Sequence, residues 1–371
     1  MRYKESQVVE VFNQTLSSQP WPPPGVSLIA ARRMWPTTQG KGVVVAVLDT
    51  GIDDQHPDLQ GNVIGGRSFV PGEADYRDGN GHGTHVAGTI AAHGKILGVA
   101  PQASLLAVKV LNHYGAGSYV SIRQGLAWAR NWEGKNGERV NIVNLSLGGP
   151  LPNSSLHEEI KKAVAAGITV VCAAGNSGDG KPGTPEISYP AYYQETVAVG
   201  AANLKTGIAN FSNSNERIDI VAPGVNTYST YPDGRYVELS GTSMATPHIS
   251  GALALICSRY HMRFRDYPSP AYLNDLLHYM AIDLGQIGFD KLFGYGLFSF
   301  NLDGGKSIVL TAGKNQYQIN DRSASFQMAP FIYEKECCAS ILEISELLGC
   351  DAAFLPSDGG GNESGQVQIW D

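Results

Sequence analysis

Short apolar segments recur along the first 300 residues, with helix-like segments between them. The apolar segments are continuous rather than alternating, which is typical of parallel strands buried on both faces. They lie at 43–49, 103–111, 141–147, 168–175, 196–202 and 218–224. Helical periods occur at 118–132, 154–167 and from 242 to about 259. This βαβ rhythm predicts an α/β fold, with a doubly wound, mostly parallel sheet flanked by helices.

The rhythm changes near residue 303. From residue 307 the sequence reads as hairpin-like strands, one helix at 339–349, a glycine-rich loop and a last strand. At the other end, residues 1–20 are polar and lead into the proline-rich stretch QPWPPPG. We therefore predict an N-terminal extension over 1–20, a large α/β domain over 21–303 and a small α+β domain over 307–371.

Composition narrows the class of protein. The 371 residues are 43% hydrophobic and 16% charged, which is typical of a globular chain. The formal net charge of −7 argues against a nucleic-acid partner, because phosphate binding needs a basic surface. No membrane span and no signal peptide can be recognised, and the five cysteines read as reduced thiols. We therefore expect a cytoplasmic protein without membrane contact or organic cofactor.

Three polar residues stand where buried chemistry would need them. Asp49 ends the first predicted strand, and His82 lies in the glycine-rich segment GHGTHVAG at the start of a helix. Ser243 stands at the start of another helix, in SGTSMATPH. A serine is a weak nucleophile that needs a base, and the base needs a third group that fixes its tautomer. The chain order Asp, His, Ser is one of the known orders of a catalytic triad.

Each of these residues also has a structural interpretation. Asp49 and Ser243 are both of a type that often caps a helix N-terminus. A lone histidine is more often a packed core or surface residue than a catalyst. His82 and His85 are also spaced like a pair of metal ligands, but no acidic or cysteine ligands lie beside them.

Taken together, the motifs resemble those of the subtilisin-like serine proteases, the subtilases, over about residues 25–300. The matching segments are VLDTGIDDQHPDL, GHGTHVAGTIAA, LGVAPQASLLAVKVL, SLGGP, CAAGNSG, YPAYY, VAVGA, FSN, VAPG and SGTSMATPH. The short N-terminal extension and the segment VVCAAGN are similar to those of the intracellular subtilisins of Gram-positive bacteria.

The resemblance implies a serine endopeptidase that acts on proteins or peptides through an acyl-enzyme. Ser243 would be the nucleophile, His82 the general base and Asp49 the group that orients His82. The side-chain amide of Asn176 would stabilise the oxyanion, assisted by the Ser243 N–H and by Thr242, although Asn176 also suits a turn. Two alternatives use the same residues: an acyl transferase or macrocyclase, and an inactive protease-like scaffold.

The resemblance also implies where a substrate binds. An extended peptide would pair with two edges of the cleft through main-chain hydrogen bonds. Tyr119 would border the pocket for the fourth residue before the cut, or be a helix-surface aromatic. Ser188 maps near the floor of the primary pocket, where no charge is expected, so we predict a broad preference for large apolar or aromatic residues. The two edges are formed by Gly115, Ala116 and Gly117, and by Ser146, Leu147 and Gly148.

Calcium is the one metal that the resemblance suggests. Asp58 matches a carboxylate that binds calcium in many relatives, but the loop that completes their site is here only HGKIL, at 93–97. That loop is about three residues short and lacks the asparagine ligand. Because a hard cation needs six or more oxygens, we expect Asp58 to be a turn or salt-bridge residue instead. A weaker site at the carbonyls of Ala191, Tyr193 and Thr196 stays open.

The two ends of the chain depart from the family pattern. By similarity to the intracellular subtilisins, residues 1–20 are expected to hold the enzyme inactive as a zymogen, and a disordered tail is the alternative. Residues 307–371 resemble the small stalk-type domain at the N-terminus of some copper amine oxidases, which does not hold the copper. This domain is expected to mediate self-assembly or to cover surface. Its relatives are often extracellular, so export by another route stays open.

Overall fold

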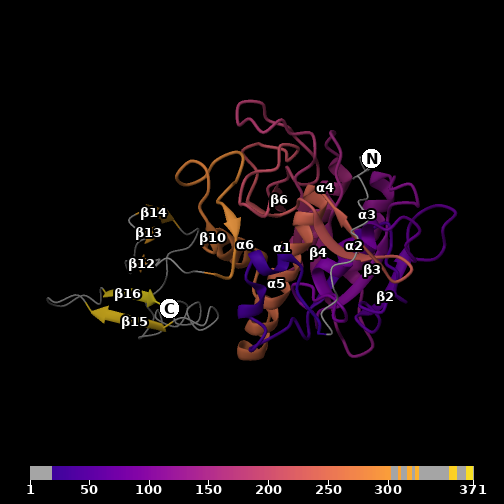
Figure 1. The fold of residues 1–371 in the computed structure, drawn as a ribbon, viewed down its shortest axis with the longest axis horizontal. Helices are drawn as coiled ribbons and strands as arrows, with labels where there is room; N and C mark the ends of the chain where they lie inside the picture. The colour runs from indigo at the N-terminus through magenta and orange to yellow at the C-terminus, as the bar shows by residue number, and fades with distance from the viewer. Residues whose placement is uncertain are drawn as a thin grey trace. The chain divides into compact units, whose positions relative to one another are not determined.

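The computed structural model describes residues 19–301 and, beyond them, the backbone of five short strands (Figure 1). The chain divides into two compact units, Met1–Ser299 and Phe300–Asp371. The first unit contains the helices α1 Pro24–Leu28, η1 Ala31–Arg33 (a 3₁₀ helix), α2 His82–Ala91, α3 Tyr119–Asn131, α4 Ser154–Ala165, α5 Thr242–Phe264 and α6 Pro270–Tyr279. Its strands are β1 Val44–Asp49, β2 Val63–Ser68, β3 Ser104–Lys109, β4 Val140–Leu145, β5 Thr169–Ala173, β6 Val197–Ala202, β7 Ile220–Pro223, β8 Thr227–Tyr231, β9 Arg235–Leu239, β10 Ala281–Ile282 and β11 Leu297–Phe298.

Nine of these strands form one sheet, in the order β10-β11-β7-β6-β5-β4-β1-β3-β2. All neighbouring strands are parallel except β10 and β11. Strand β1 lies between β3 and β4, so the chain winds outward from β1 in both directions. The prediction of a doubly wound, mostly parallel sheet is confirmed.

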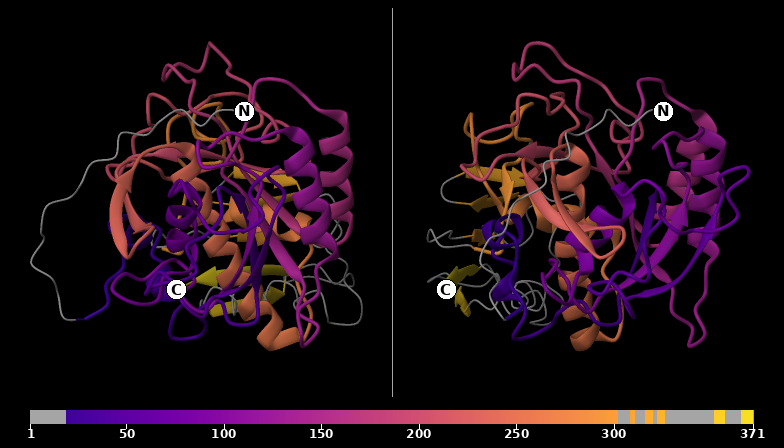
Figure 2. Two further views of the ribbon diagram at one scale, coloured as in Figure 1. Left: turned by 90° about the vertical axis from the view of Figure 1, so that its right-hand side faces the viewer. Right: turned by 45° about the vertical axis from the view of Figure 1, so that its right-hand side comes forward.

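Helices cover both faces of this sheet (Figures 1 and 2). Helices α3 and α4 pack together on one face, and α2 and α5 pack together on the other. Every residue of β1 is buried, and Val44, Ala46 and Leu48 belong to the cluster on the α3–α4 face. Because successive side chains of a strand point to opposite faces, Val45 and Val47 face α2 and α5. Burial on both faces explains why the apolar segments are continuous.

The two helices that carry His82 and Ser243 begin differently from their neighbours. Helices α3 and α4 begin after Ser118 and Asn153, whose side chains accept hydrogen bonds from the first turn. Helices α2 and α5 begin after glycines and have no side-chain cap from the preceding residue. The first N–H groups of a helix lack partners within the helix, so in α2 and α5 they are available to groups elsewhere in the fold.

Several elements were not predicted from the sequence, among them β2, the β8–β9 hairpin and α6. Strand β2 has the sequence VIGGRS and is only partly buried, so it offers no continuous apolar run. Strands β8 and β9 pair antiparallel in a separate two-stranded sheet. Among the described residues, no helix is both long enough and apolar enough to span a membrane.

The second unit contains antiparallel strands. Strands β12 Ile308–Leu310, β13 Gln316–Ile319 and β14 Arg322–Ser325 form one sheet, and β15 Asp351–Pro356 pairs with β16 Gly365–Trp370. The helix predicted at 339–349 and most of the predicted extension, residues 1–18, lie outside the described residues. The domain limits given above stay predictions.

Candidate active site

Several of the predicted site residues lie at the carboxyl ends of the central strands. Asp49 is the last residue of β1, Ser146 directly follows β4, and Asn176 follows β5. Strand β1 is where the winding direction of the sheet reverses, and doubly wound sheets bind ligands in the crevice at that reversal. The topology thus brings together residues that are far apart in the sequence.

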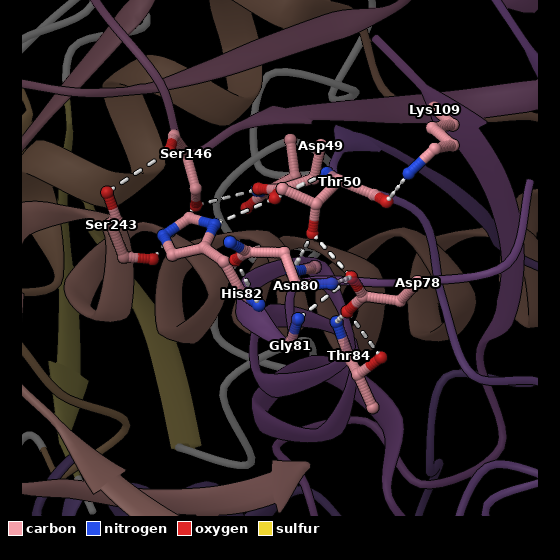
Figure 3. A network of polar contacts seen from close by, with 12 residues as sticks. Asp49, Thr50, Asp78, Asn80, Gly81, His82, Thr84, Lys109, Ser146 and Ser243 are labelled. Atoms are coloured by element: carbon pink, nitrogen blue, oxygen red, sulfur yellow. Dashed lines mark hydrogen bonds and ion pairs between the residues drawn. The ribbon is translucent and has the colours of Figure 1, made fainter. Parts of the chain in front are cut away.

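Asp49 and His82 form a buried pair. The distance between Asp49 Oδ1 and His82 Nδ1 is 2.7 Å, and the side chains are 0% and 2% exposed. The backbone N–H of Thr50 donates to the same carboxylate oxygen at 2.7 Å. Asp49 therefore orients a histidine and does not cap a helix. A proton held on Nδ1 leaves Nε2 as the basic nitrogen, and Figure 3 shows the imidazole between Asp49 and Ser243.

Ser243 is the second residue of α5 and is 4% exposed. Its hydroxyl donates to the carbonyl oxygen of Ser146 at 3.1 Å, and the Ser146 hydroxyl donates to the Ser243 carbonyl at 2.8 Å. The N-cap of α5 is Gly241, so Ser243 is not the cap of this helix. Its backbone N–H lies in the first turn, where an N–H has no partner within the helix and the helix dipole favours negative charge.

Asn176 is oriented by Thr242. Its amide oxygen accepts the backbone N–H of Thr242 at 2.8 Å and the Thr242 hydroxyl at 2.9 Å. Because a backbone N–H only donates, the amide oxygen must face Thr242, and the NH₂ group is turned away from it. Thr242 thus positions Asn176 through its N–H and its hydroxyl, and its direct assistance at the oxyanion stays a prediction.

A polar network behind the triad was not found from the sequence (Figure 3). Asp78 accepts the Thr50 hydroxyl at 2.8 Å and the backbone N–H groups of Asn80, Gly81 and Thr84 at 2.9 Å each. Asp78 thus supplies the start of α2 with the acceptor that its own N-cap lacks. The signal that could have found it is the acidic residue in DGNGH, directly before a helix N-terminus.

Lys109 is the second feature that the sequence reading missed. It is 1% exposed at the end of β3, and its register partner in β1 is Asp49. Its Nζ donates to the carbonyl oxygen of Thr50 and lies 3.0 Å from Glu73 Oε2. A lysine inside an apolar strand segment indicates a buried ion pair, because a fully buried charge needs a partner.

The two proposed cleft segments lie in different parts of the fold. In the first, Gly117 forms an isolated antiparallel bridge with Leu111, and Gly115 has a φ of +70°, which favours glycine. The second begins at Ser146, beside Ser243. At its other end, a Cβ on Gly148 would lie 2.4 Å from Ser188 Oγ, so Ser188 lies directly against this segment.

Tyr119 and Leu147 complete the predicted cleft set. The Tyr119 hydroxyl donates to the carbonyl oxygen of Leu151, shortly after the second segment. Tyr119 thereby connects the start of α3, which follows the first segment, with the chain beyond the second. Leu147 is buried and belongs to the core cluster on the α3–α4 face.

His82 and His85 do not act as a ligand pair. His82 Nδ1 faces Asp49, whereas His85 Nε2 lies 2.9 Å from the carbonyl oxygen of Thr227. Burial lowers the pKa of His85 to about 3, so this ring is neutral. Among the described residues, no group of three or more His, Cys, Asp or Glu side chains could hold a metal ion.

The surroundings of Asp58 do not fit a calcium ion. Its Oδ1 and Oδ2 accept the backbone N–H groups of Lys95 and Ile96, each at 2.8 Å. Burial, followed by the charge of Asp58, raises the pKa of the nearby Tyr236 hydroxyl, which stays protonated. A Cβ on Gly94 would lie 2.2 Å from Oδ1. The carboxylate thus faces donors, where calcium needs further oxygens at about 2.3–2.6 Å.

At the weaker carbonyl site, a side chain of the protein already contacts the carbonyl oxygens. The hydroxyl of Thr196 lies 3.2 Å from the carbonyl oxygen of Ala191 and 2.9 Å from that of Tyr193. Thr196 is 5% exposed, so its hydroxyl occupies the point on which these oxygens converge. A cation there would first have to displace the hydrogen bonds that these two carbonyl oxygens accept, and the weaker site stays a prediction.

Fold and site together define a serine hydrolase built on a doubly wound α/β sheet. Residues 40–296 match the profile of the subtilase family, peptidase S8. The chain belongs to this family and is a subtilisin-like serine protease, whose substrates are proteins or peptides.

Three relatives illustrate the similarity. The chain is 49% identical over 283 residues to an intracellular serine protease of Paenibacillus polymyxa, covering 74% of this chain and 84% of that protein. It is 50% identical over 245 residues to the major intracellular serine protease of Bacillus subtilis, covering 64% and 75%. It is 48% identical over 284 residues to subtilisin Savinase of Lederbergia lenta, covering 76% and 96%. The profile match ends before residue 307, so the resemblance of residues 307–371 to a stalk-type domain stays a prediction.

Proposed function

We propose that this chain is an endopeptidase that cleaves through an Asp49–His82–Ser243 triad and an acyl-enzyme. The observation that carries the proposal is the buried 2.7 Å contact between Asp49 and His82 Nδ1, with Ser243 on the other side of the ring (Figure 3). A histidine held in this way has one nitrogen committed to the carboxylate and one available as a base.

In the proposed reaction, Ser243 Oγ attacks the carbonyl carbon of the scissile peptide bond. The Ser243 hydroxyl leaves the Ser146 carbonyl, and its proton passes to His82 Nε2. Asp49 stabilises the imidazolium that forms. The tetrahedral intermediate then expels the amine, which takes the proton from His82 and leaves an acyl-enzyme. Water, deprotonated by His82, releases the acid and restores Ser243.

Two donors are proposed for the oxyanion: the NH₂ group of Asn176 and the backbone N–H of Ser243. The Thr242 contacts support the first, because they turn the amide nitrogen away from Thr242. The position of Ser243 in the first turn of α5 supports the second. Preorganised donors of this kind stabilise charge that develops in the transition state.

We propose that the primary pocket accepts large apolar or aromatic side chains. Ser188 lies close to two glycines from other segments. A Cβ on Gly148 would lie 2.4 Å from Ser188 Oγ, and a Cβ on Gly175 would lie 3.0 Å from Ser188 Cβ. None of these three residues carries a charge. Tyr119 would border a second pocket four residues before the cut. A panel of tetrapeptide anilides that differ only in the last residue tests this preference.

We further propose that residues 1–20 hold the enzyme inactive. The support is the sequence alone, in which a short polar segment precedes the proline-rich stretch at 19–25. Self-assembly through residues 307–371 and a cytoplasmic location are likewise proposals. Self-assembly is tested by comparing the molecular mass in solution of the full chain with that of a chain ending at residue 303. The names of the two intracellular relatives support the cytoplasmic location.

No calcium dependence is proposed at Asp58, because its donors come from the protein. For the same reason the carbonyl oxygens beside Thr196 are proposed to remain paired with its hydroxyl rather than with a cation.

Hydrolysis of a peptide nitroanilide ending in Ala-Ala-Pro-Phe tests the function. Three forms are compared: the full chain, the chain without residues 1–18, and that truncation with Ser243→Ala. Turnover by the truncated form alone supports both the triad and the inhibitory extension. Equal activity of the full chain removes the inhibition proposal. Joined peptide ends in the mass spectrum would favour the transferase, and inactivity of every form would favour the scaffold.

A further inference from the structure

Glu73 connects two parts of the site that belong to different segments. One carboxylate oxygen, Oε1, lies 3.1 Å from His113 Nδ1 and accepts the backbone N–H of His113 at 3.3 Å. The other, Oε2, lies 3.0 Å from the Nζ of Lys109. A single side chain thus contacts both the strand beside Asp49 and the loop after that strand.

The loop that Glu73 contacts carries the first proposed cleft segment. Within it, the backbone N–H of Asn112 donates to the carbonyl oxygen of Ala116 at 2.9 Å, and the Ala116 N–H donates to Asn112 Oδ1 at 3.1 Å. These bonds shape the loop but do not attach it to the rest of the domain. The backbone N–H of Leu111 attaches the start of the loop by donating to the Asp49 carbonyl oxygen at 3.1 Å. Two side chains attach its middle: Glu73 contacts His113, and the side-chain amide of Asn80 donates to the His113 carbonyl oxygen at 3.0 Å.

Both side-chain attachments lead to the triad within a few hydrogen bonds. Lys109 donates to the carbonyl oxygen of Thr50, and the Thr50 N–H donates to Asp49 Oδ1. Asn80 Oδ1 accepts the backbone N–H of His82 at 3.2 Å. The loop is therefore held by residues whose other contacts hold the aspartate and the histidine.

The charges favour this arrangement. Burial raises the pKa of Glu73, but hydrogen bonds from His113 and Lys109 outweigh it and leave that pKa below its ordinary value. Glu73 is therefore ionised at neutral pH, opposite the buried ammonium group of Lys109. The His113 side chain is half exposed, whereas that of Lys109 is buried, so the His113 contact is the weaker of the two.

We propose that Glu73 is a positioning residue that couples the substrate-binding loop at 111–117 to the catalytic aspartate, with His113 as its contact on the loop. This inference rests on the proposed role of Gly115 to Gly117 as a substrate-binding edge. It concerns substrates that extend along that edge, and it adds a residue that touches neither the substrate nor the reacting atoms.

Two substrates separate positioning from a general loss of activity. One is the anilide ending in Ala-Ala-Pro-Phe, which extends along the proposed edge; the other is N-acetyl-tyrosine ethyl ester, which reaches only the primary pocket. All variants are made in the chain without residues 1–18. They are His113→Ala, which removes the side-chain contact on the loop but keeps the backbone N–H bond of residue 113 to Glu73, and Glu73→Gln, which weakens both contacts of Glu73. Glu158→Gln removes an exposed ion pair on α4 and is the matched control.

We expect His113→Ala to raise KM for the anilide about two- to fivefold, as for a half-exposed charged contact. The effect on the ester is smaller, so the ratio of the two kcat/KM values shifts. Glu73→Gln shifts that ratio at least as far and also lowers kcat for both substrates. The double variant with Glu73→Gln and His113→Ala shows the same ratio as Glu73→Gln alone. Glu158→Gln leaves both substrates unchanged.

An equal loss on both substrates in His113→Ala, or an unchanged ratio in both variants, overturns the proposal. Thermal unfolding is measured alongside, because Glu73→Gln leaves a buried ammonium poorly paired and can lower stability. If Glu73→Gln fails to fold, the ratio of the two kcat/KM values in His113→Ala still tests the proposal. The wild type and Ser243→Ala, assayed in parallel, show separately whether the protease assignment itself holds.

Discussion

Replacing Asp58 with asparagine tests whether protein donors or a cation hold the 93–97 segment. The carboxylate is 2% exposed and accepts two backbone N–H groups at 2.8 Å. An asparagine keeps one oxygen acceptor and turns an NH₂ group toward a donor. One buried N–H is then unsatisfied and the remaining bonds lose their charge, which together cost about 3 kcal/mol.

For a domain of this size, that loss lowers Tm by roughly 4–6 °C. The assay is thermal unfolding in a Ser243→Ala background, which prevents self-digestion, with a chelator and with added calcium. We expect the same decrease in Tm in both conditions, because the donors to the Asp58 carboxylate are backbone N–H groups. Asp179→Asn is the matched control, since Asp179 accepts similar bonds on the surface, and it should change Tm little.

Two other outcomes would show that Asp58 does not act as a hydrogen-bond acceptor for this loop. If calcium raises the Tm of the parent protein and Asp58→Asn abolishes that response, Asp58 is a metal ligand. If Asp58→Asn leaves Tm unchanged in both conditions, the hydrogen bonds do not stabilise the loop. A calcium response that survives Asp58→Asn would point to another site and would leave the statement about Asp58 intact.

Further predictions concern catalysis and acid stability. Asp49→Asn should lower kcat about 10⁴-fold with KM little changed, since His82 loses its fixed tautomer; steady-state kinetics checks this. Asn176→Ala should lower kcat by about 10²–10³, the loss known for such a donor in a subtilisin, and an equal effect on KM would contradict an oxyanion role. Burial lowers the pKa of His85 to about 3 and that of His248 to about 4. Both contribute stability above pH 6.5 that is lost as pH falls toward 4, by up to about 2.7 kcal/mol per pH unit, and urea unfolding of His248→Gln should show a flatter dependence.

Much of the fold follows from the apolar pattern alone. Strands such as β1 are buried on both faces, so their sequences are continuous and their limits can be predicted within a residue or two. Strand β2 escaped prediction because it is a half-buried edge strand with two glycines, whose conformation is set by pairing with β3. Strand order also depends on contacts distant in sequence, which no local pattern contains.

In the candidate site, too, some residues can be predicted from the sequence and others cannot. Asp49, His82 and Ser243 stand out because each lies in a small-residue segment at the end of a strand or the start of a helix. Their supports do not: Asp78 and Lys109 act only through partners that the fold brings near. Thr242 illustrates the limit, because the sequence suggests a role at the oxyanion but not that its N–H and hydroxyl position Asn176.

The central claim is that Ser243 is a nucleophile activated by His82. The most direct measurement is labelling of the chain without residues 1–18 by a fluorophosphonate, followed by peptide mapping. We expect a single label, on Ser243, that disappears in His82→Ala while the protein stays folded. A label on another serine, or equal labelling of Ser243 without His82, would contradict it.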